Sequence, residues 1–273
     1  MHKIILLFLM SFILLFCSQK DSKTNADSEV LDVAAKERIR SQVEKLDTNQ
    51  NISVDFITGH FDPSKDSSFV LIPDKYSDRH GMYMKKEAFN AFKKMYDAAK
   101  EDNINLVVRS ATRNFDYQKG IWERKWKGEA KLSNGENAMT AYEDENARAL
   151  KILEYSSMPG TSRHHWGTDI DLNNFNNEWF ESGEGLALFT WLENNAEKFG
   201  FCRPYTTLDK SRPFGYNEEK WHWSYTPLSD VYTSYASKYL KNKDIHGFAG
   251  SAVASKIDVV SKYVLGINQN CNH

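Results

Sequence analysis

The sequence has few cysteines and no surplus of charge of either sign. Its 273 residues include three cysteines, and 35 lysines and arginines face 37 aspartates and glutamates, for a formal net charge of -2. Binding to phosphate backbones or anionic lipid surfaces draws on a basic surplus, so we expect no nucleic-acid partner. The mean hydropathy of -0.61 excludes a polytopic membrane protein, because each span needs about 20 predominantly apolar residues.

One long apolar run is present, and it lies at the start of the chain. It extends from Ile4 to Phe16, follows the basic Lys3, and is closed by Cys17. This pattern is typical of a secretory signal peptide, and the closing cysteine resembles a bacterial lipoprotein signal. Because Phe16 stands where such signals carry a small residue, an uncleaved N-terminal anchor is the alternative. In both cases we expect export to the periplasmic or cell-surface side, with the body attached to the membrane.

The rest of the chain shows no internal repeat and no domain linker after residue 50. We expect a signal over 1–17, a tether with a spacer helix over 18–50, and a single catalytic domain over 51–273. The expected spacer helix rests on apolar positions spaced at helical intervals between residues 28 and 46. We expect the protein to be a monomer.

Apolar spacing and turn residues within the domain predict helices first and short strands later. The pattern indicates helices over 85–100, 115–126, 142–155 and 185–198, and strands over 104–108, 201–204 and 221–225. This order is typical of an α+β domain with one sheet and differs from the regular alternation of a doubly wound fold.

Two of the cysteines, Cys202 and Cys271, lie within the expected domain. In an oxidising compartment they could form a disulfide that ties the C-terminal tail to the body. Two unpaired thiols are the equally open alternative, because nothing in the sequence reports the distance between them.

Imidazole and carboxylate groups gather in two short segments, residues 162–171 and 219–225. A catalytic zinc takes three protein ligands from His, Asp, Glu or Cys and keeps one position open for water. The first segment can supply an imidazole and a carboxylate from two short strands joined by a glycine-containing turn, and the second supplies another imidazole. No HExxH helix is present, which excludes the common zincin geometry.

A general base is also available beside the second segment. Glu219 lies three residues before His222, so its carboxylate can lie near a metal without being a ligand. Such a carboxylate can take a proton from a water whose pKa the metal has lowered, and can pass it on to the leaving amine.

These segments carry a resemblance to a known family. Residues 162–171 resemble the SxHxxGxAxD motif, and residues 219–222 the ExxH motif, of the VanY-like zinc D-alanyl-D-alanine carboxypeptidases. Residues 110–118, which include Arg113 and Gln118, resemble the SGYRS-x-x-x-Q segment of that family. The family shares the zinc fold of the lysostaphin-type peptidases and the hedgehog proteins, which implies a small central antiparallel sheet that carries one zinc ion and is flanked by helices.

The resemblance implies a role for each matching residue. The zinc ligands would be His164, Asp171 and His222, and the general base would be Glu219. Arg113 would bind the scissile carbonyl and stabilise its oxyanion, a role that suits a guanidinium group. The residues that would hold the substrate are Gln118 and Ser162.

The sequence departs from the family motif at Asp169, which replaces a small alanine two residues before Asp171. Asp169 could compete as a ligand or act as a partner of a ligand, and the motif position favours Asp171 as the ligand. His165, next to His164, should point to the opposite face, toward substrate or the surface. We expect the tryptophans to lie in the core, except Trp166, which falls within the metal loop.

The resemblance implies a zinc-dependent D-alanyl-D-alanine carboxypeptidase that trims peptidoglycan stem peptides. An LD-carboxypeptidase or a peptidoglycan endopeptidase of the same fold is one alternative, because specificity comes from loops that carry no motif. A non-catalytic cell-wall binding module is another, although such a module would be expected to lose a ligand or the base.

Overall fold

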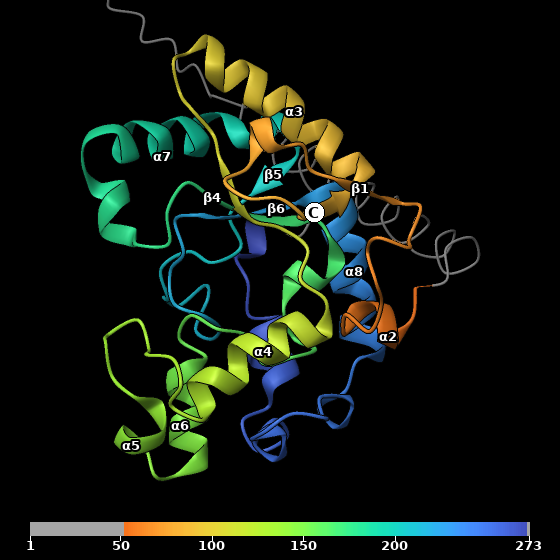
Figure 1. Cartoon of the computed structure of the whole chain (residues 1–273), viewed down its shortest axis with the longest axis vertical. Coiled ribbons are helices and arrows are strands. Elements are labelled where there is room, and N and C mark those ends of the chain that lie inside the picture. Colours follow the sequence, from red (N-terminus) through yellow and green to blue (C-terminus); the bar gives the residue numbers. More distant parts are fainter. Residues whose placement is uncertain (1–51, 272–273) are drawn as a thin grey trace, which may run out of the picture.

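Residues 52–271 are described in the computed structural model, and two antiparallel sheets with surrounding helices make up an α+β architecture (Figure 1). The expected fold class is therefore confirmed. The predicted signal, tether and spacer helix lie outside the described residues and stay predictions. Among the helices of residues 52–271, none combines the length and the apolar character needed to cross a membrane.

A four-stranded sheet runs through the middle of the domain. Its strands, in spatial order, are β3 (Val108–Ser110), β4 (Asp169–Leu172), β6 (His222–Tyr225) and β5 (Phe201–Cys202), and all neighbours are antiparallel. Residues directly opposite in an antiparallel pair point to the same face. The pairing of Asp171 with His222 therefore places two predicted metal ligands side by side on one face.

The other face of this sheet is apolar and covered by two long helices. Side chains of alternate positions on β4 and β6 join a core that includes α3 (Lys86–Glu101) and α7 (Gly183–Asn195). Figure 1 shows both helices at the same end of the molecule. A two-stranded sheet of β1 (Phe69–Leu71) and β2 (Tyr83–Lys85) leads into α3. The helices predicted over 85–100 and 185–198 are confirmed within a few residues at their ends.

A second core lies on the side of the sheet to which Asp171 and His222 point. It is formed by α4 (Phe115–Trp126), α6 (Glu145–Ile152), α8 (Thr226–Tyr239) and the chain that follows α8. The short α2 (Val54–Ile57) packs on α8. Helix α4 begins where the sequence predicts, because the Asn114 side chain accepts a hydrogen bond from the Tyr117 N–H.

Single-turn helices make up most of the remaining regular structure. The 3-10 helices are η1 (Asp74–Tyr76), η2 (Arg163–Trp166), η3 (Asn177–Glu181), η4 (Ala196–Phe199), η5 (Asn242–Asp244), η6 (Ser251–Val253) and η8 (Gln269–Cys271), and η7 (Val260–Val264) is a π-helix turn.

The helix predicted over 142–155 is wrong in its extent. The chain instead forms α5 (Ala138–Ala141), a break, and then α6. Each of these two helices has its own N-cap. Asn137 accepts hydrogen bonds from the first turn of α5, and Asp144 accepts one from Ala147 N at 2.8 Å. A side chain that satisfies the free N–H groups of a first turn sets where the helix begins.

The strand predicted over 104–108 is also displaced, because regular pairing starts only at Val108. Before that point the backbone bonds to Asn173, whose backbone N donates to Val107 O at 2.9 Å and whose side chain bonds on both sides of it. Asn173 accepts from Val107 N at 3.0 Å and donates to Asn105 O at 2.8 Å. Asn173 itself has a left-handed backbone with φ of 59°, a conformation that asparagine tolerates better than most residues.

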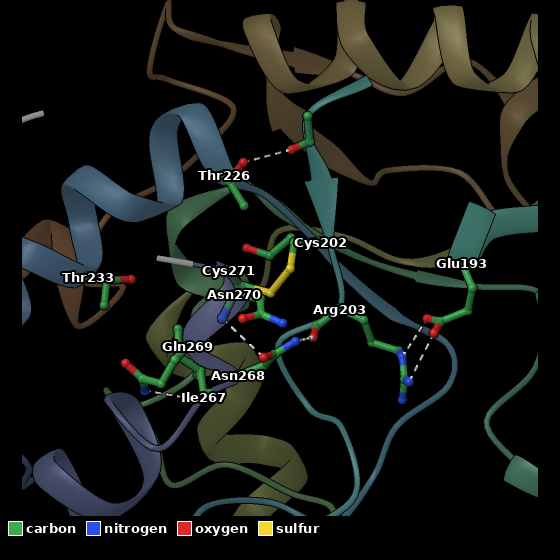
Figure 2. The surroundings of a disulfide bond; sticks show 12 residues. Glu193, Cys202, Arg203, Thr226, Thr233, Ile267, Asn268, Gln269, Asn270 and Cys271 are labelled. Atoms are coloured by element: carbon green, nitrogen blue, oxygen red, sulfur yellow. Dashed lines mark hydrogen bonds and ion pairs between the residues drawn. A yellow bond between two sulfur atoms is a disulfide. The ribbon is translucent and has the colours of Figure 1, made fainter. Parts of the chain in front are cut away.

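The C-terminal tail returns to the sheet and is held there by a disulfide. Cys202, on β5, is bonded to the buried Cys271 across a sequence separation of 69 residues (Figure 2). Beside the bridge, Asn268 N donates to Pro204 O at 2.8 Å. Of the two alternatives that the sequence left open, the structure has the disulfide.

Candidate metal centre and active-site cavity

Three buried side chains, His164, Asp171 and His222, converge on one face of the four-stranded sheet. His164 Nε2 lies 3.2 Å from Asp171 Oδ2, and His222 Nδ1 lies 3.0 Å from Asp171 Oδ1. One ligand atom from each residue can be chosen so that all lie within 4.8 Å of one another. Zinc ligands surround the ion at about 2.0–2.2 Å, so nitrogen and oxygen atoms at this spacing fit a single cation.

The backbone explains how residues far apart in sequence come together. Asp171 and His222 are opposite each other on β4 and β6, whereas His164 comes from the 3-10 helix η2. The expectation of a strand at His164 is therefore wrong. Gly167 ends η2 with φ of 73°, in the left-handed region that favours glycine, and turns the chain directly into β4.

Each histidine has one ring nitrogen engaged by the protein and the other facing Asp171. His164 Nδ1 lies 2.8 Å from the carbonyl oxygen of Ala111, which can only accept, so Nε2 is left for the metal. His222 Nε2 lies 2.9 Å from Asp169 Oδ2, which leaves Nδ1. Hydrogen bonds of this kind fix the tautomer and orientation of metal-binding histidines.

Asp169 contacts the His222 ring at Nε2, whereas Asp171 contacts the same ring at Nδ1. Its Oδ1 accepts from Thr168 and Ser224, at 2.7 and 2.9 Å, and its Oδ2 accepts from Arg163 Nε at 3.1 Å. The Asp169 and Arg163 side chains are fully buried, so each supplies the other's countercharge. The geometry favours Asp169 as a partner of His222 and not as a competing ligand.

Burial and neighbouring charges shift the protonation of this cluster. Burial alone would raise the pKa of Asp171, but the charges and hydrogen bonds of His164 and His222 hold it well below its usual range. Burial alone would lower the pKa of His222, but the hydrogen bonds that its ring donates to the Asp169 and Asp171 carboxylates outweigh this effect and raise the pKa to about 9. Asp171 thus stays anionic, and a cation bound beside it would replace the proton on His222 Nδ1. Carboxylate oxygen and imidazole nitrogen are a donor set that suits zinc.

Glu219 lies beside the cluster without joining it. Its Oε2 is 3.6 Å from His222 Nδ1, and the Tyr205 carbonyl accepts a hydrogen bond from its backbone N–H. Its side chain is 9% exposed, and burial raises the pKa of its carboxyl group to about 8. A carboxyl group with a raised pKa, within reach of the open side of a metal, has the character of a general base.

Arg113 lies at the rim of the cluster, just beyond β3. Its Nη1 donates to Ser110 Oγ at 2.6 Å and lies 3.4 Å from Asp171 Oδ2, and its Nε donates to Gln118 Oε1 at 2.9 Å. Its backbone is held as well, because Arg113 N donates to the His164 carbonyl at 3.2 Å. The guanidinium group is therefore fixed beside the candidate metal position.

Gln118 and Ser162, the two residues predicted to hold the substrate, differ in their contacts within the protein. Gln118 uses its amide oxygen for Arg113 and its amide nitrogen for Ser157 O, at 2.8 Å, so within the protein it positions the arginine. Ser162 is 1% exposed, and its Oγ has no hydrogen-bond partner among the described residues. A direct contact of either residue with substrate stays a prediction.

Two expectations next to His164 are wrong. His165 is fully buried: its Nδ1 donates to Arg113 O at 2.6 Å, and its Nε2 accepts from Gly160 N at 3.1 Å. Burial lowers its pKa to about 3, so the ring is neutral. Trp166 belongs to the core and donates to Ile57 O. The 3-10 turn, unlike a strand, sends both side chains inward.

A cavity of about 1090 Å³ opens over the cluster. Sequence motifs missed most of its lining, which includes the basic residues Arg79, Arg124, Lys125 and Lys131 and the aromatic residues Tyr117, Tyr155, Phe175, Tyr205, Tyr216 and Trp221. The one signal that the sequence offered was helical spacing, since Gln118, Ile121 and Lys125 share a face of α4. A cavity of this size accommodates several residues of a peptide.

The chain matches known proteins over this region. Residues 81–228, more than half of the chain, match the VanY model, described as D-alanyl-D-alanine carboxypeptidase. YodJ of Bacillus subtilis (strain 168), named as a carboxypeptidase, is 27% identical over 262 residues, covering 84% of this chain and 85% of YodJ. The D-alanyl-D-alanine carboxypeptidase of Enterococcus faecalis (strain ATCC 700802 / V583) is 30% identical over 134 residues, 49% of this chain and 45% of that protein.

Solved structures with a similar course of the chain include VanYB in complex with D-Alanine-D-Alanine. That structure has a TM-score of 0.46 and 22% identity, and the match covers 62% of this chain and 84% of that one. The LdcB LD-carboxypeptidase also has a TM-score of 0.46 and 22% identity, with 75% and 81% covered. From the extent of the family match, the chain belongs to the VanY family of D-alanyl-D-alanine carboxypeptidases and is a peptidase.

Proposed function

We propose that this peptidase is zinc-dependent and removes the terminal D-alanine from peptidoglycan stem peptides. The observation that carries the proposal is the convergence of His164, Asp171 and His222 with Glu219 and Arg113 at one cavity. The family match supports the choice of a D-alanyl-D-alanine bond.

The residues present fit one zinc ion. His164 through Nε2, His222 through Nδ1 and Asp171 through its carboxylate would hold it, because the other ring nitrogen of each histidine is already engaged. When bound there, zinc lowers the pKa of a water toward about 7 and polarises the scissile carbonyl.

Glu219 moves the proton. Its carboxylate accepts a proton from the attacking water and then delivers it to the nitrogen of the departing D-alanine. Its burial near His222 supports this role, since a raised pKa makes the same group an effective base and then an effective acid.

Arg113 stabilises the negative charge that develops on the carbonyl oxygen. Its hydrogen bonds to Ser110 and Gln118 hold the guanidinium in place before substrate arrives, so little reorganisation is needed during the reaction. Gln118, which matches the family motif, contributes by holding Arg113 in position.

The test is mass spectrometry of muropeptides digested by the purified protein. The proposal expects pentapeptide stems to lose one terminal D-alanine, in a reaction that a zinc chelator abolishes. Loss of alanine from tetrapeptide stems would identify an LD-carboxypeptidase, and larger fragments an endopeptidase. Failure to cleave any muropeptide would favour a non-catalytic wall-binding module.

The Glu219→Gln variant tests the mechanism within the same assay. It should retain zinc, because Glu219 lies outside the ligand set, and should lose nearly all hydrolysis. A loss of about 10²–10⁴-fold in kcat is typical of removing a general base. His222→Ala is the matched comparison, since it should lose the metal in elemental analysis. A fully active Glu219→Gln protein would refute the assigned base.

We also propose that the protein is exported and tethered to the membrane through its N-terminal segment. The signal-like run that ends at Cys17 and the Cys202–Cys271 disulfide support this location, because structural disulfides persist in oxidising compartments. Cell fractionation tests it: the protein should sediment with membranes and be accessible from outside the cytoplasm. Lipid on Cys17, detected by mass spectrometry of the mature N-terminus, would identify the anchor.

A further inference from the structure

We propose that Lys125 binds the free carboxylate at the C-terminus of the substrate and thereby restricts the enzyme to peptide ends. The inference rests on the proposed function, because it names the group that recognises the end of the stem peptide. No motif includes Lys125, and its place in the cavity comes only from the fold of α4.

A cation beyond the scissile bond would suit a substrate with a free C-terminus. In a carboxypeptidase substrate the terminal carboxylate lies one residue beyond the scissile carbonyl, about 3.8 Å along the backbone. Arg113 cannot serve both groups without giving up its fixed position, since its Nε and Nη1 are already held by Gln118, Ser110 and Asp171. A second cation in the same cavity could bind the carboxylate and compensate for its loss of water.

Lys125 lies on the cavity face of α4, in its last turn. It follows Gln118 by seven residues, two turns of helix, so both side chains project from the same face. Helical side chains lean toward the helix N-terminus, which directs Lys125 back toward Gln118 and Arg113. Both residues line the same cavity as Glu219 and His222.

Hydrogen bonds show that the Lys125 ammonium group reaches this region. Its Nζ donates to Ser156 Oγ at 2.5 Å, and the next residue, Ser157, accepts through its carbonyl from Gln118 Nε2 at 2.8 Å. The same Gln118 amide accepts from Arg113. A connected set of groups therefore links the two cations along one wall of the cavity.

Among the described residues, Lys125 has no carboxylate within ion-pair distance, whereas neighbouring lysines have one. Lys119 and Lys127, on the same helix, both pair with Glu123, at 3.2 Å in each case. Within residues 52–271, Lys125 Nζ forms no ion pair with a carboxylate; its hydrogen bond is to the Ser156 hydroxyl. Burial lowers the pKa of Lys125, and Glu219 is the strongest charge that opposes this effect. A bound substrate carboxylate would supply the missing countercharge.

The other basic residues of the lining are less suited to this role. Arg124 is exposed, and the Arg79 guanidinium donates to the Arg109 carbonyl at 2.8 Å. Lys131 is also exposed and follows the end of α4. A carboxylate bound next to the metal cluster has to be desolvated, which favours the half-buried ammonium over the exposed ones.

The experiment compares two synthetic stem pentapeptides that differ only at the C-terminus, one with a free carboxylate and one with an amide. Binding is measured by calorimetry in the zinc-loaded Glu219→Gln background, so that the peptides stay intact. Lys125→Met should weaken binding of the free acid by about 10- to 100-fold, the range for a lost hydrogen bond to a charged group. Binding of the amide should change less than twofold, and Lys125→Arg should restore part of the affinity for the acid.

Lys127→Met is the control, because Lys127 lies on the same helix, is paired with Glu123 and does not line the cavity. It should leave the binding of both peptides unchanged. Equal weakening of acid and amide by Lys125→Met would show a purely structural role and overturn the inference, as would no weakening. If neither peptide binds the Glu219→Gln protein that retains Lys125, the proposed function fails, and the inference fails with it.

Discussion

At the scale of single residues, hydrogen bonds to one ring nitrogen of His164 and of His222 decide which nitrogen is left to face a metal. Asp169 bonds to His222 Nε2, and the Ala111 carbonyl bonds to His164 Nδ1. The motif of the family has alanine at position 169, so this chain has added a carboxylate whose charge Arg163 balances. Such partners orient a ligand and raise its basicity.

Replacing Asp169 should therefore weaken metal binding without removing a ligand. We expect Asp169→Asn to lower zinc affinity by about 10- to 100-fold, the typical effect of losing such a partner. Competition with a chromogenic chelator measures the affinity, and the cobalt-substituted protein should show an altered visible spectrum. Unchanged affinity and spectrum would show that Asp169 only neutralises Arg163.

A residue away from the site gives the domain a distinctive pH dependence. Lys85 is 8% exposed; burial lowers its pKa from 10.5 to about 8, while Asp66, 3.9 Å away, opposes the shift. Between these two pKa values the unfolded chain binds more protons than the folded one, so stability rises with pH across this window.

The Lys85→Met variant should lose this dependence. From the two pKa values, wild type gains about 2 kcal/mol relative to the variant between pH 7 and pH 9.5. Urea unfolding at both pH values, with the disulfide intact, measures the difference. A constant difference between the two proteins across this range would contradict the prediction.

At the scale of elements, the turn between η2 and β4 sets the distance between two candidate ligands, His164 and Asp171. Gly167 has φ of 73°, and a Cβ at this position would lie 2.3 Å from Phe69 Cε1. The turn thus needs glycine for its backbone conformation and for the close approach of β1. His164 lies three residues before it and Asp171 four residues after it.

Gly167→Ala should destabilise the protein and loosen the metal cluster together. A left-handed alanine costs about 1–2 kcal/mol, and the clash adds about 1–3 kcal/mol. Gly135→Ala is the matched control, because Gly135 has φ of 84° and open space around its Cβ position. Thermal unfolding and zinc affinity are the measurements; equal effects of the two substitutions would show that Phe69 yields without cost.

At the scale of the whole molecule, the chain after α8 closes the fold by returning to β5. The tail packs on the second core through several buried residues before Cys271 joins Cys202 (Figure 2). The single domain predicted over 51–273 stays a prediction.

Removing the bridge should lower the free energy of unfolding without changing the active site. For a closed loop of this length, chain entropy predicts about 4 kcal/mol, and measured effects are often smaller. We expect Cys202→Ser/Cys271→Ser to lose about 2–4 kcal/mol in denaturant unfolding and to keep its zinc. Wild type under reducing conditions should match the variant, and equal midpoints for oxidised and reduced wild type would contradict the prediction.

The sequence by itself determined the fold class of this protein and its membership of a peptidase family. The sequence also predicted which side chains would come together, namely His164, Asp171, Glu219 and His222. The candidate ligands and the candidate base lie within short segments, where a local pattern is informative. The ends of elements were less predictable where a side chain such as Asp144 or Asn173 replaced the expected backbone pattern.

Only the tertiary structure decided how each side chain is used. It placed His165 behind Arg113, turned Gln118 onto that arginine, brought Asp169 to His222 and put Lys125 into the cavity. Two of these arrangements, His165 with Arg113 and Asp169 with His222, join residues 52 and 53 positions apart. Lys125 faces the site only because α4 packs where it does. A local sequence pattern carries no information on such contacts, since packing between distant elements sets them.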